Sequence, residues 1–203
     1  MSTYRKEVFR KTIHMLSVVL AIMWLYALED WKMSVAYAGA SVLVFYPLLR
    51  LMAKIPGLSS FMNARKSGDY ANSYFMLVAT YVAVAIACWG LYGERLLGVA
   101  SFLAWGPGDA AAALVGKKYG KHRIGKEKRK TLEGSLAMFL FCFLGVFAVL
   151  MVYNRYSIPM TVLVSLITAV VTTIVEFLAP GGCDTFLCPV SAMIILLIFA
   201  NLL

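Results

Sequence analysis

The sequence predicts an all-α fold, a polytopic helical membrane protein with about seven transmembrane helices and a cytosolic N-terminus. Three observations predict it: 62% of the 203 residues are hydrophobic, only 14% are charged, and the mean hydropathy is +0.80. Soluble domains are nearer half apolar and a quarter charged. A water-soluble core cannot absorb that much apolar surface, so many of these side chains must face lipid.

Seven apolar runs account for most of the chain, and each approaches the roughly 20 residues that a helix needs to cross a hydrocarbon core. The runs cover residues 12–28, 33–53, 72–92, 95–116, 133–153, 158–178 and 186–203. Because they leave no room for a soluble domain, we expect residues 1–203 to form a single membrane domain. Only the connections at 54–71 and 117–132 are long enough to contribute a ligand site.

Lysines and arginines predict the orientation of these spans. Sixteen of the nineteen lie in the N-terminal segment, the 50–71 region and the 117–130 loop, whereas Lys32, Arg95 and Arg155 lie at the other ends of the runs. The positive-inside rule assigns the sixteen to the cytosol, which places the C-terminus outside. The compact size favours a multi-pass protein of a prokaryotic cytoplasmic membrane.

The net charge of +9 does not indicate nucleic-acid binding, because the cations lie in short loops between apolar runs. The four cysteines show no short metal-binding spacing, so neither disulfides nor structural zinc is expected. No small-residue cleavage site follows the basic N-terminus, and we expect a retained first span rather than a signal peptide. The sequence does not indicate an oligomeric state.

Asp109 is the clearest candidate for a functional residue, because an acidic side chain at membrane depth needs a partner or a role. It follows Gly106-Pro107-Gly108, where we expect the helix to break or kink and to free backbone groups toward a cavity. The alanines at 110–113 leave room for close helix packing or for a bulky ligand. The alternative is a structural Asp109 that pairs with one loop lysine.

The basic 117–130 loop suits a polyanionic ligand, since lysine and arginine bind phosphate oxygens and glycine admits close backbone N–H groups. Orientation and attraction to anionic lipid are the alternative explanation for such a loop. Thr131 favours a ligand, because it can cap the fifth helix, whose positive end would then point into the same pocket. Glu133 and Ser135 lie in that first turn, although Glu133 is equally typical of a helix start.

Two further carboxylates and a histidine reach the same side of the membrane. Glu176 lies near the end of the sixth run, and Asp184 follows a turn that Pro180 and two glycines force. His14 lies one turn into the first span; a lone histidine is more often a packing residue, but here it belongs to a group.

That group comprises His14, Asp109, Glu133, Glu176 and Asp184. Its carboxylates and the neighbouring cations suit a Mg²⁺-nucleotide, because acids hold the hard cation and lysine or arginine the phosphate oxygens. A cavity open to cytosol and lipid would let a water-soluble phosphoryl donor meet a lipid alcohol. One carboxylate would accept the proton of the hydroxyl.

The motifs that carry these residues resemble the membrane-bound CTP-dependent lipid kinases, the family of dolichol kinase, phytol kinase and the CTP-using diacylglycerol kinase. The matching pieces cover nearly the whole chain: Arg10 to His14, Gly108-Asp109 with Ala112-Ala113, Gly116 and Gly120, Lys130 to Ser135, and Glu176 with Asp184. The Lys-Thr-Leu-Glu-Gly-Ser piece is closer to the dolichol and diacylglycerol kinase form than to the Lys-Ser form of phytol kinase, which favours a long polyprenol. Asp184-Thr185 departs from the Asp-Asn that the family often has.

The resemblance implies a polyprenol kinase with CTP as co-substrate, Mg²⁺ as cofactor and a membrane lipid alcohol as acceptor, giving the polyprenyl monophosphate. The catalytic candidates are Asp109, Glu133, Glu176, Asp184 and His14, and the metal candidates are Asp109, Glu133 and Asp184. The nucleotide-binding candidates are Gly116, Lys117, Lys118, Gly120, Lys121, Arg123, Lys130, Thr131, Gly134 and Ser135.

Other functions remain open at this stage. A CTP-dependent diacylglycerol kinase that makes phosphatidate and a phosphatidate cytidylyltransferase are alternatives within lipid enzymology. A small cation-coupled transporter would use Asp109 and Glu176 as intramembrane ion sites, but the sequence has no evident internal repeat and its polar groups gather on one side. A structural membrane protein is a further alternative. It would require each of the five residues of the group above to have a separate structural role, which is less probable than one shared site.

Overall fold

The computed structural model describes residues 3–55, 69–124, 130–180 and 182–202. Within these residues, seven helical segments are long and apolar enough to cross a membrane, which confirms the predicted fold class. The spans are α1 (Thr3–Ala27), α2 (Trp31–Met52), α4 (Asp69–Val84) continued by the π-helical η1 (Ala85–Leu91), α5 (Arg95–Tyr119), α6 (Leu132–Tyr153), α7 (Ile158–Leu178) and α8 (Asp184–Leu202).

Two local features differ from the expectation. The start of α1 includes the charged first turns, where Glu7 and Arg10 form an ion pair at helical i, i+3 spacing. An antiparallel hairpin of β1 (Arg123–Ile124) and β2 (Lys130–Thr131) leads from α5 into α6. Most of the 54–71 connection lies outside the described residues.

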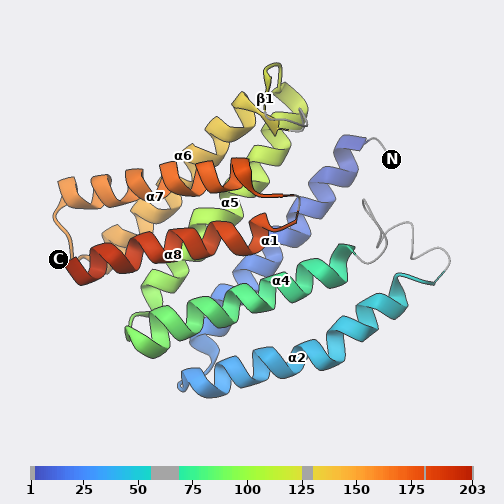
Figure 1. The fold of residues 1–203 in the computed structure, drawn as a ribbon, viewed down its shortest axis with the longest axis horizontal. Coiled ribbons are helices and arrows are strands. Elements are labelled where there is room, and N and C mark those ends of the chain that lie inside the picture. The colour runs from blue at the N-terminus through green and yellow to red at the C-terminus, as the bar shows by residue number, and fades with distance from the viewer. Residues whose placement is uncertain (1–2, 56–68, 125–129, 181, 203) are drawn as a thin grey trace.

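Helix α5 is the centre of the bundle and α2 is its edge. Of the apolar window of each helix, 61% is buried in α5 and 6% in α2. Figure 1 shows α5 crossing between α6 and α1, while α2 runs along the outside beside α4. The N-terminus and the hairpin lie at one end of the bundle and the C-terminus at the other. The centre of the fold therefore carries Asp109.

The expected break at Gly106-Pro107-Gly108 does not occur, since α5 is one helix from Arg95 to Tyr119. Proline has no N–H for the carbonyl of Leu103, four residues earlier, to accept. That carbonyl instead faces α6, where a Cβ on Gly145 would lie 2.8 Å from the Leu103 oxygen. A polar carbonyl that touches a neighbouring backbone is tolerated within a transmembrane helix.

Glycines set the distance between α5 and its neighbours. A Cβ on Gly106 would lie 2.8 Å from Cγ1 of Val18 in α1, and a Cβ on Gly108 would lie 2.5 Å from Sδ of Met138 in α6. Val18 and Met138 are fully buried. Small residues at such contacts let helix backbones approach closely, which is how packing stabilises transmembrane helices.

Substituting Gly145 with alanine should lower the free energy of unfolding by about 1–3 kcal/mol, because the new methyl group meets backbone that cannot move aside. Gly39→Ala is the matched control: Gly39 lies in α2, and a Cβ there would meet nothing within 4 Å. Thermal unfolding of both variants in detergent tests the prediction. An unchanged melting temperature for Gly145→Ala would contradict the close approach of α5 and α6.

Candidate active site

Asp109 lies in the middle of α5 with only 8% of its surface exposed. The ammonium of Lys11, in α1, donates to its Oδ2. Nε2 of His14, one turn further along α1, lies 3.3 Å from the same oxygen. Lys11 is itself 4% exposed. The partner of Asp109 is therefore a buried helical lysine rather than the loop lysine that the structural alternative assumed.

One face of α1 is charged, which explains how the pair with Asp109 forms. Glu7, Arg10, Lys11 and His14 recur at the three- and four-residue spacing that aligns side chains along a helix. Glu7 is buried, pairs with Arg10 and also accepts from Lys117 of α5 at 3.4 Å. The polar face of α1 thus turns toward α5 and away from lipid.

Trp105 supports the histidine from one turn earlier in α5. The rings of His14 and Trp105 meet edge to face, with centroids 4.5 Å apart and planes at 89°. Trp105 is 1% exposed, and its Nε1 has no hydrogen-bond partner in the described part of the chain. Its packing fixes the imidazole ring beside Asp109.

Buried Glu176 and partly exposed Lys130 form a second ion pair at the same end of the bundle. Lys130 Nζ donates to Glu176 Oε1 at 2.7 Å and also to the main-chain carbonyl of Glu176. Glu176, in the last turn of α7, is 7% exposed. Because Lys130 lies in β2, this pair joins the hairpin to α7.

Asp184 opens α8 and completes the group of carboxylates. Its Oδ1 accepts from the backbone N–H of Thr185 at 3.0 Å. Its charge interacts with those of Asp109, Glu176 and the ammonium of Lys11. Four of the five predicted catalytic candidates, His14, Asp109, Glu176 and Asp184, thus lie near one another.

Glu133 lies apart from these four residues. Gly108 packs on Met138, so Glu133 is about 7 Å further along α6 toward the hairpin. Its carboxylate accepts from the backbone N–H groups of Lys121 and His122 at 3.1 and 3.2 Å, and contacts His122 Nδ1 at 2.8 Å. In this position Glu133 shapes the loop between α5 and the hairpin.

Thr131 caps α6 as predicted, because its Oγ1 accepts from the N–H of Gly134 at 3.1 Å. The same side chain packs into a small space bordered by Gly116, Gly120 and Gly134, which we call the Thr131 notch. A Cβ on Gly116 would lie 2.7 Å from Thr131 Oγ1, a Cβ on Gly120 would lie 2.5 Å from its Cγ2, and a Cβ on Gly134 would lie 2.8 Å from the Ala112 carbonyl. In this structure these candidate nucleotide-binding residues hold α5 and α6 together.

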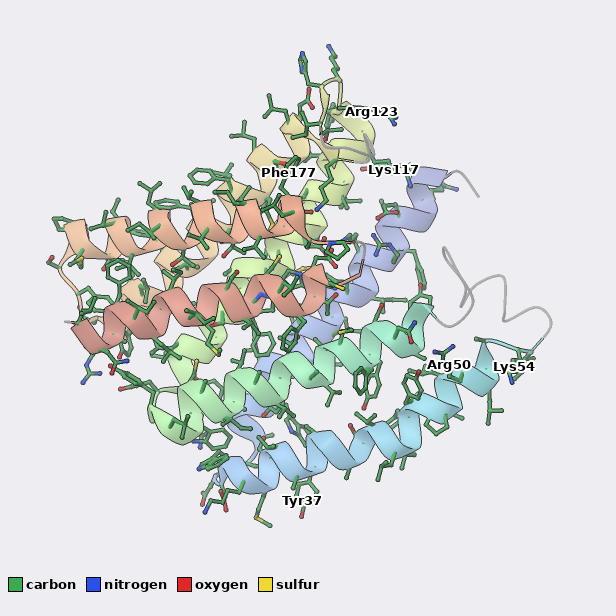
Figure 2. All side chains as sticks on the ribbon, viewed as in Figure 1. Tyr37, Arg50, Lys54, Lys117, Arg123 and Phe177 are labelled. Carbon is green, nitrogen blue, oxygen red and sulfur yellow. The ribbon has the colours of Figure 1, made fainter. Side chains whose placement is uncertain are left out.

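The remaining nucleotide-binding candidates line the outer end of the site. Lys117, Lys118, Lys121 and Arg123 are exposed, and Ser135 is partly buried in the first turn of α6. Figure 2 shows Lys117 and Arg123 at the hairpin end of the bundle. Three further cations of this loop, Lys126, Lys128 and Arg129, fall outside the described residues.

The sequence reasoning missed Lys11 and Glu7 as members of the site. Both were visible in the charged face of α1, whose residues share one helical spacing with His14. In the part of the chain that the structure describes, no three His, Cys, Asp or Glu side chains converge as a ready metal site. Asp109, Glu176 and Asp184 interact as charges without sharing one centre.

The bundle and its one-sided group of carboxylates and cations define an integral membrane protein with a charged site at one membrane face. No family model and no solved structure matches the chain. The phytol kinase of Synechocystis sp. (strain ATCC 27184 / PCC 6803 / Kazusa) is 30% identical over 200 residues, which cover 93% of this chain and 78% of that protein. The chain belongs to the family of membrane lipid kinases that includes this enzyme.

Two plant proteins extend the comparison. Dolichol kinase EVAN of Arabidopsis thaliana is 30% identical over 156 residues, 70% of this chain and 27% of that protein. The probable chloroplastic phytol kinase 2 of Glycine max is 28% identical over 152 residues, 73% of this chain and 47% of that protein. This chain therefore matches less than half the length of either plant relative.

Replacing Lys11 with methionine should lower the free energy of unfolding by about 3–5 kcal/mol, because Asp109 is then buried without its ammonium partner. The double variant Lys11→Met, Asp109→Leu removes both charges and should recover most of that loss. Thermal unfolding in detergent gives both values. Lys54→Met, at an exposed lysine, is the control and should shift stability by less than about 0.5 kcal/mol. Wild-type stability in Lys11→Met would contradict a structural role for the pair.

Proposed function

We propose that the chain is a CTP-dependent kinase that transfers the γ-phosphate of CTP to the hydroxyl of a polyprenol or dolichol-type alcohol in the membrane. One observation carries the proposal: buried Asp109 pairs with Lys11, has His14 3.3 Å from the same oxygen, and interacts as a charge with Glu176 and Asp184. The relatives named phytol kinase and dolichol kinase support an isoprenoid alcohol as the acceptor.

The two substrates approach from different sides. The exposed cations Lys117, Lys118, Lys121 and Arg123 suit the triphosphate of a nucleotide that arrives from water, because phosphoryl transfer depends chiefly on positioning and on neutralising charge. The lipid alcohol arrives from the membrane. The carboxylates Asp109, Glu176 and Asp184 are less exposed than these cations.

In the proposed reaction the acceptor oxygen attacks the γ-phosphorus, and the bond from that phosphorus to the bridging oxygen breaks. CDP leaves with the electron pair of that bond, and the hydroxyl proton passes to the carboxylate of Asp109. Lys11 donates to Oδ2 of that carboxylate, and His14 Nε2 lies 3.3 Å from the same oxygen. Lys11 and Arg10 offset the negative charge of this carboxylate before it accepts the proton.

The carboxylates fit Mg²⁺ by their chemistry. Mg²⁺ is usually held by one or two protein carboxylates together with waters and substrate phosphates, so three converging ligands are not required. Asp184, whose charge interacts with that of Asp109, would hold it, whereas Asp109 acts as the base and Glu133 lies nearer the loop. When bound, the ion offsets charge on the transferred phosphoryl group.

Phytol is the second candidate acceptor. The Lys130 to Ser135 motif favours a long polyprenol, but the relative that shares most of its length with this chain is named a phytol kinase. Both are isoprenoid alcohols with one terminal hydroxyl. They differ in the length of the hydrocarbon chain that the membrane-facing surface of the protein must accommodate.

The test is transfer of γ-labelled phosphate from CTP, and in parallel from ATP, to polyprenol, dolichol, phytol and diacylglycerol by the purified protein in detergent with Mg²⁺. Label in an isoprenoid alcohol from CTP is the expected result. Label in diacylglycerol would show that diacylglycerol, and not an isoprenoid alcohol, is the acceptor. Label transferred from ATP alone would show that ATP, and not CTP, is the donor. Folded protein that transfers no label would contradict kinase activity.

In the same assay, Asp109→Asn should lower turnover by at least about a hundredfold, because the amide cannot accept the hydroxyl proton. Asp30→Asn is the matched control. Asp30 caps α2 and accepts from the N–H of Lys32, and asparagine caps helices equally well. An active, folded Asp109→Asn protein would remove Asp109 from the mechanism.

We also propose that the site faces the cytosol. Cys183 is half-buried between α7 and α8, whereas Cys88, Cys142 and Cys188 are buried. A membrane-impermeant maleimide should therefore label Cys183 in inverted vesicles and not in intact cells. Ser157→Cys in a Cys183→Ser background moves the thiol to the exposed opposite connection and should reverse the pattern. Labelling of Cys183 in intact cells would show that the site faces outward and would contradict the proposed orientation.

A further inference from the structure

Glu7 is a buried carboxylate that pairs with cations of two different helices. Its Oε1 accepts from Nη2 of Arg10, one turn further along α1, and its Oε2 lies 3.4 Å from Nζ of Lys117 in α5. Figure 2 shows Lys117 beside the charged end of α1. Each oxygen of one carboxylate thus contacts a different cation, and we call Glu7, Arg10 and Lys117 the Glu7 cluster.

We propose that Glu7 is a positioning residue of the nucleotide site, which holds Arg10 and Lys117 side by side so that both bind the polyphosphate of the nucleotide. The inference rests on the proposed kinase function for the identity of that nucleotide. Glu7 does not itself touch the nucleotide, because it carries the same sign of charge. It acts through the two cations.

The first argument is the place of the Glu7 cluster between water and the buried carboxylate of the site. Helices α1 and α5 contact each other at Lys11–Asp109 and at Glu7–Lys117. They therefore run antiparallel, and Lys117 lies about 12 Å from Asp109 along α5. Arg10 lies between these two contacts, and its charge interacts with that of Asp109. A polyphosphate that extends from water toward Asp109 would meet both cations of the cluster.

The second argument is the order of exposure within the Glu7 cluster. The side chains of Arg10 and Lys117 are 29% and 33% exposed, whereas that of Glu7 is 11% exposed. An anion from water therefore reaches the cations more readily than the carboxylate that holds them. Glu7 occupies Nη2 of the guanidinium, and arginine has five N–H donors in all. Arginine and lysine are the side chains that bind phosphate oxygens.

The third argument is the behaviour of the two cations without Glu7. Two like charges held close together repel each other, and free arginine and lysine side chains must be ordered when a ligand binds. Glu7 offsets that repulsion and fixes both side chains in advance. A carboxylate near a phosphate also repels it, but here the cations are the more exposed groups and shield the phosphate from Glu7. We therefore expect Glu7 to strengthen the binding of the nucleotide.

The first test is a substitution that removes the charge of Glu7 and keeps its shape. Glu7→Gln should raise the KM for CTP about tenfold, because two long side chains lose their fixed positions, without changing the KM for the lipid alcohol. Glu94→Gln is the matched control. Glu94 pairs with Arg155 at 3.5 Å at the opposite end of the bundle, and its substitution should change neither constant.

A double-mutant cycle separates positioning from a general effect of the substitution. Arg10→Gln alone should also raise the KM for CTP. In the Arg10→Gln background, Glu7→Gln should have a smaller effect than in the wild type, because one of the side chains that it positions has lost its charge. Additive effects would contradict the positioning role.

Glu7→Asp serves as a further variant if Glu7→Gln folds poorly, which thermal unfolding in detergent shows. Aspartate keeps the charge but is one methylene shorter, so it does not reach both cations. It should raise the KM for CTP by a smaller factor than Glu7→Gln. A wild-type KM for CTP in Glu7→Asp would contradict the need for a carboxylate that contacts both cations.

Isothermal titration with magnesium tripolyphosphate, without lipid, measures binding independently of catalysis. The affinity of Glu7→Gln should be about tenfold lower than that of the wild type, and Glu94→Gln should bind as the wild type does. Unchanged or tighter binding in folded Glu7→Gln would overturn the inference, while phosphate transfer by the wild type would leave the kinase intact. Weaker binding in Glu7→Gln, with a folded wild type that transfers no phosphate, would instead retain the role of Glu7 and overturn the kinase.

Discussion

The ion pair between Lys11 and Asp109 is the interaction on which the arrangement of the site depends. An unpaired charge buried among transmembrane helices is costly, so each of these two residues stabilises the other. The pair joins α1 to the central helix α5 at a fixed height. His14, one turn further along α1, thereby comes to lie against both Asp109 and Trp105.

Close backbone packing does the corresponding work between α5 and α6. Gly108 and Gly145 bring the two helices together within the membrane, and the Thr131 notch continues that contact to the end of α6. Because Thr131 caps α6, the preceding residue, Lys130, is fixed where it meets Glu176. Packing and electrostatics thus position the two lysines of the site from opposite sides of α5.

Hydropathy and charge were sufficient to predict the seven spans, because burial in lipid depends on long apolar runs that are local in sequence. The contacts of the site were not local. The partner of Asp109 lies 98 residues away, and Glu133 proved to contact Lys121 and His122 rather than the other carboxylates. Helix α5 continues through Pro107, and the Leu103 carbonyl lies against Gly145 of α6, a contact that the residues around the proline do not indicate.

The depth of each charged group is consistent with the proposed reaction. The cations that α5 and the hairpin expose to water lie outermost, whereas Asp109 is buried among helices. A nucleotide needs strong positive charge but cannot enter hydrocarbon, and a lipid hydroxyl can reach membrane depth but carries no charge. The Lys130–Glu176 pair is intermediate, because Lys130 is partly exposed and Glu176 is buried. The transferred phosphate gives the lipid a charged head, which is stable only where water can solvate it.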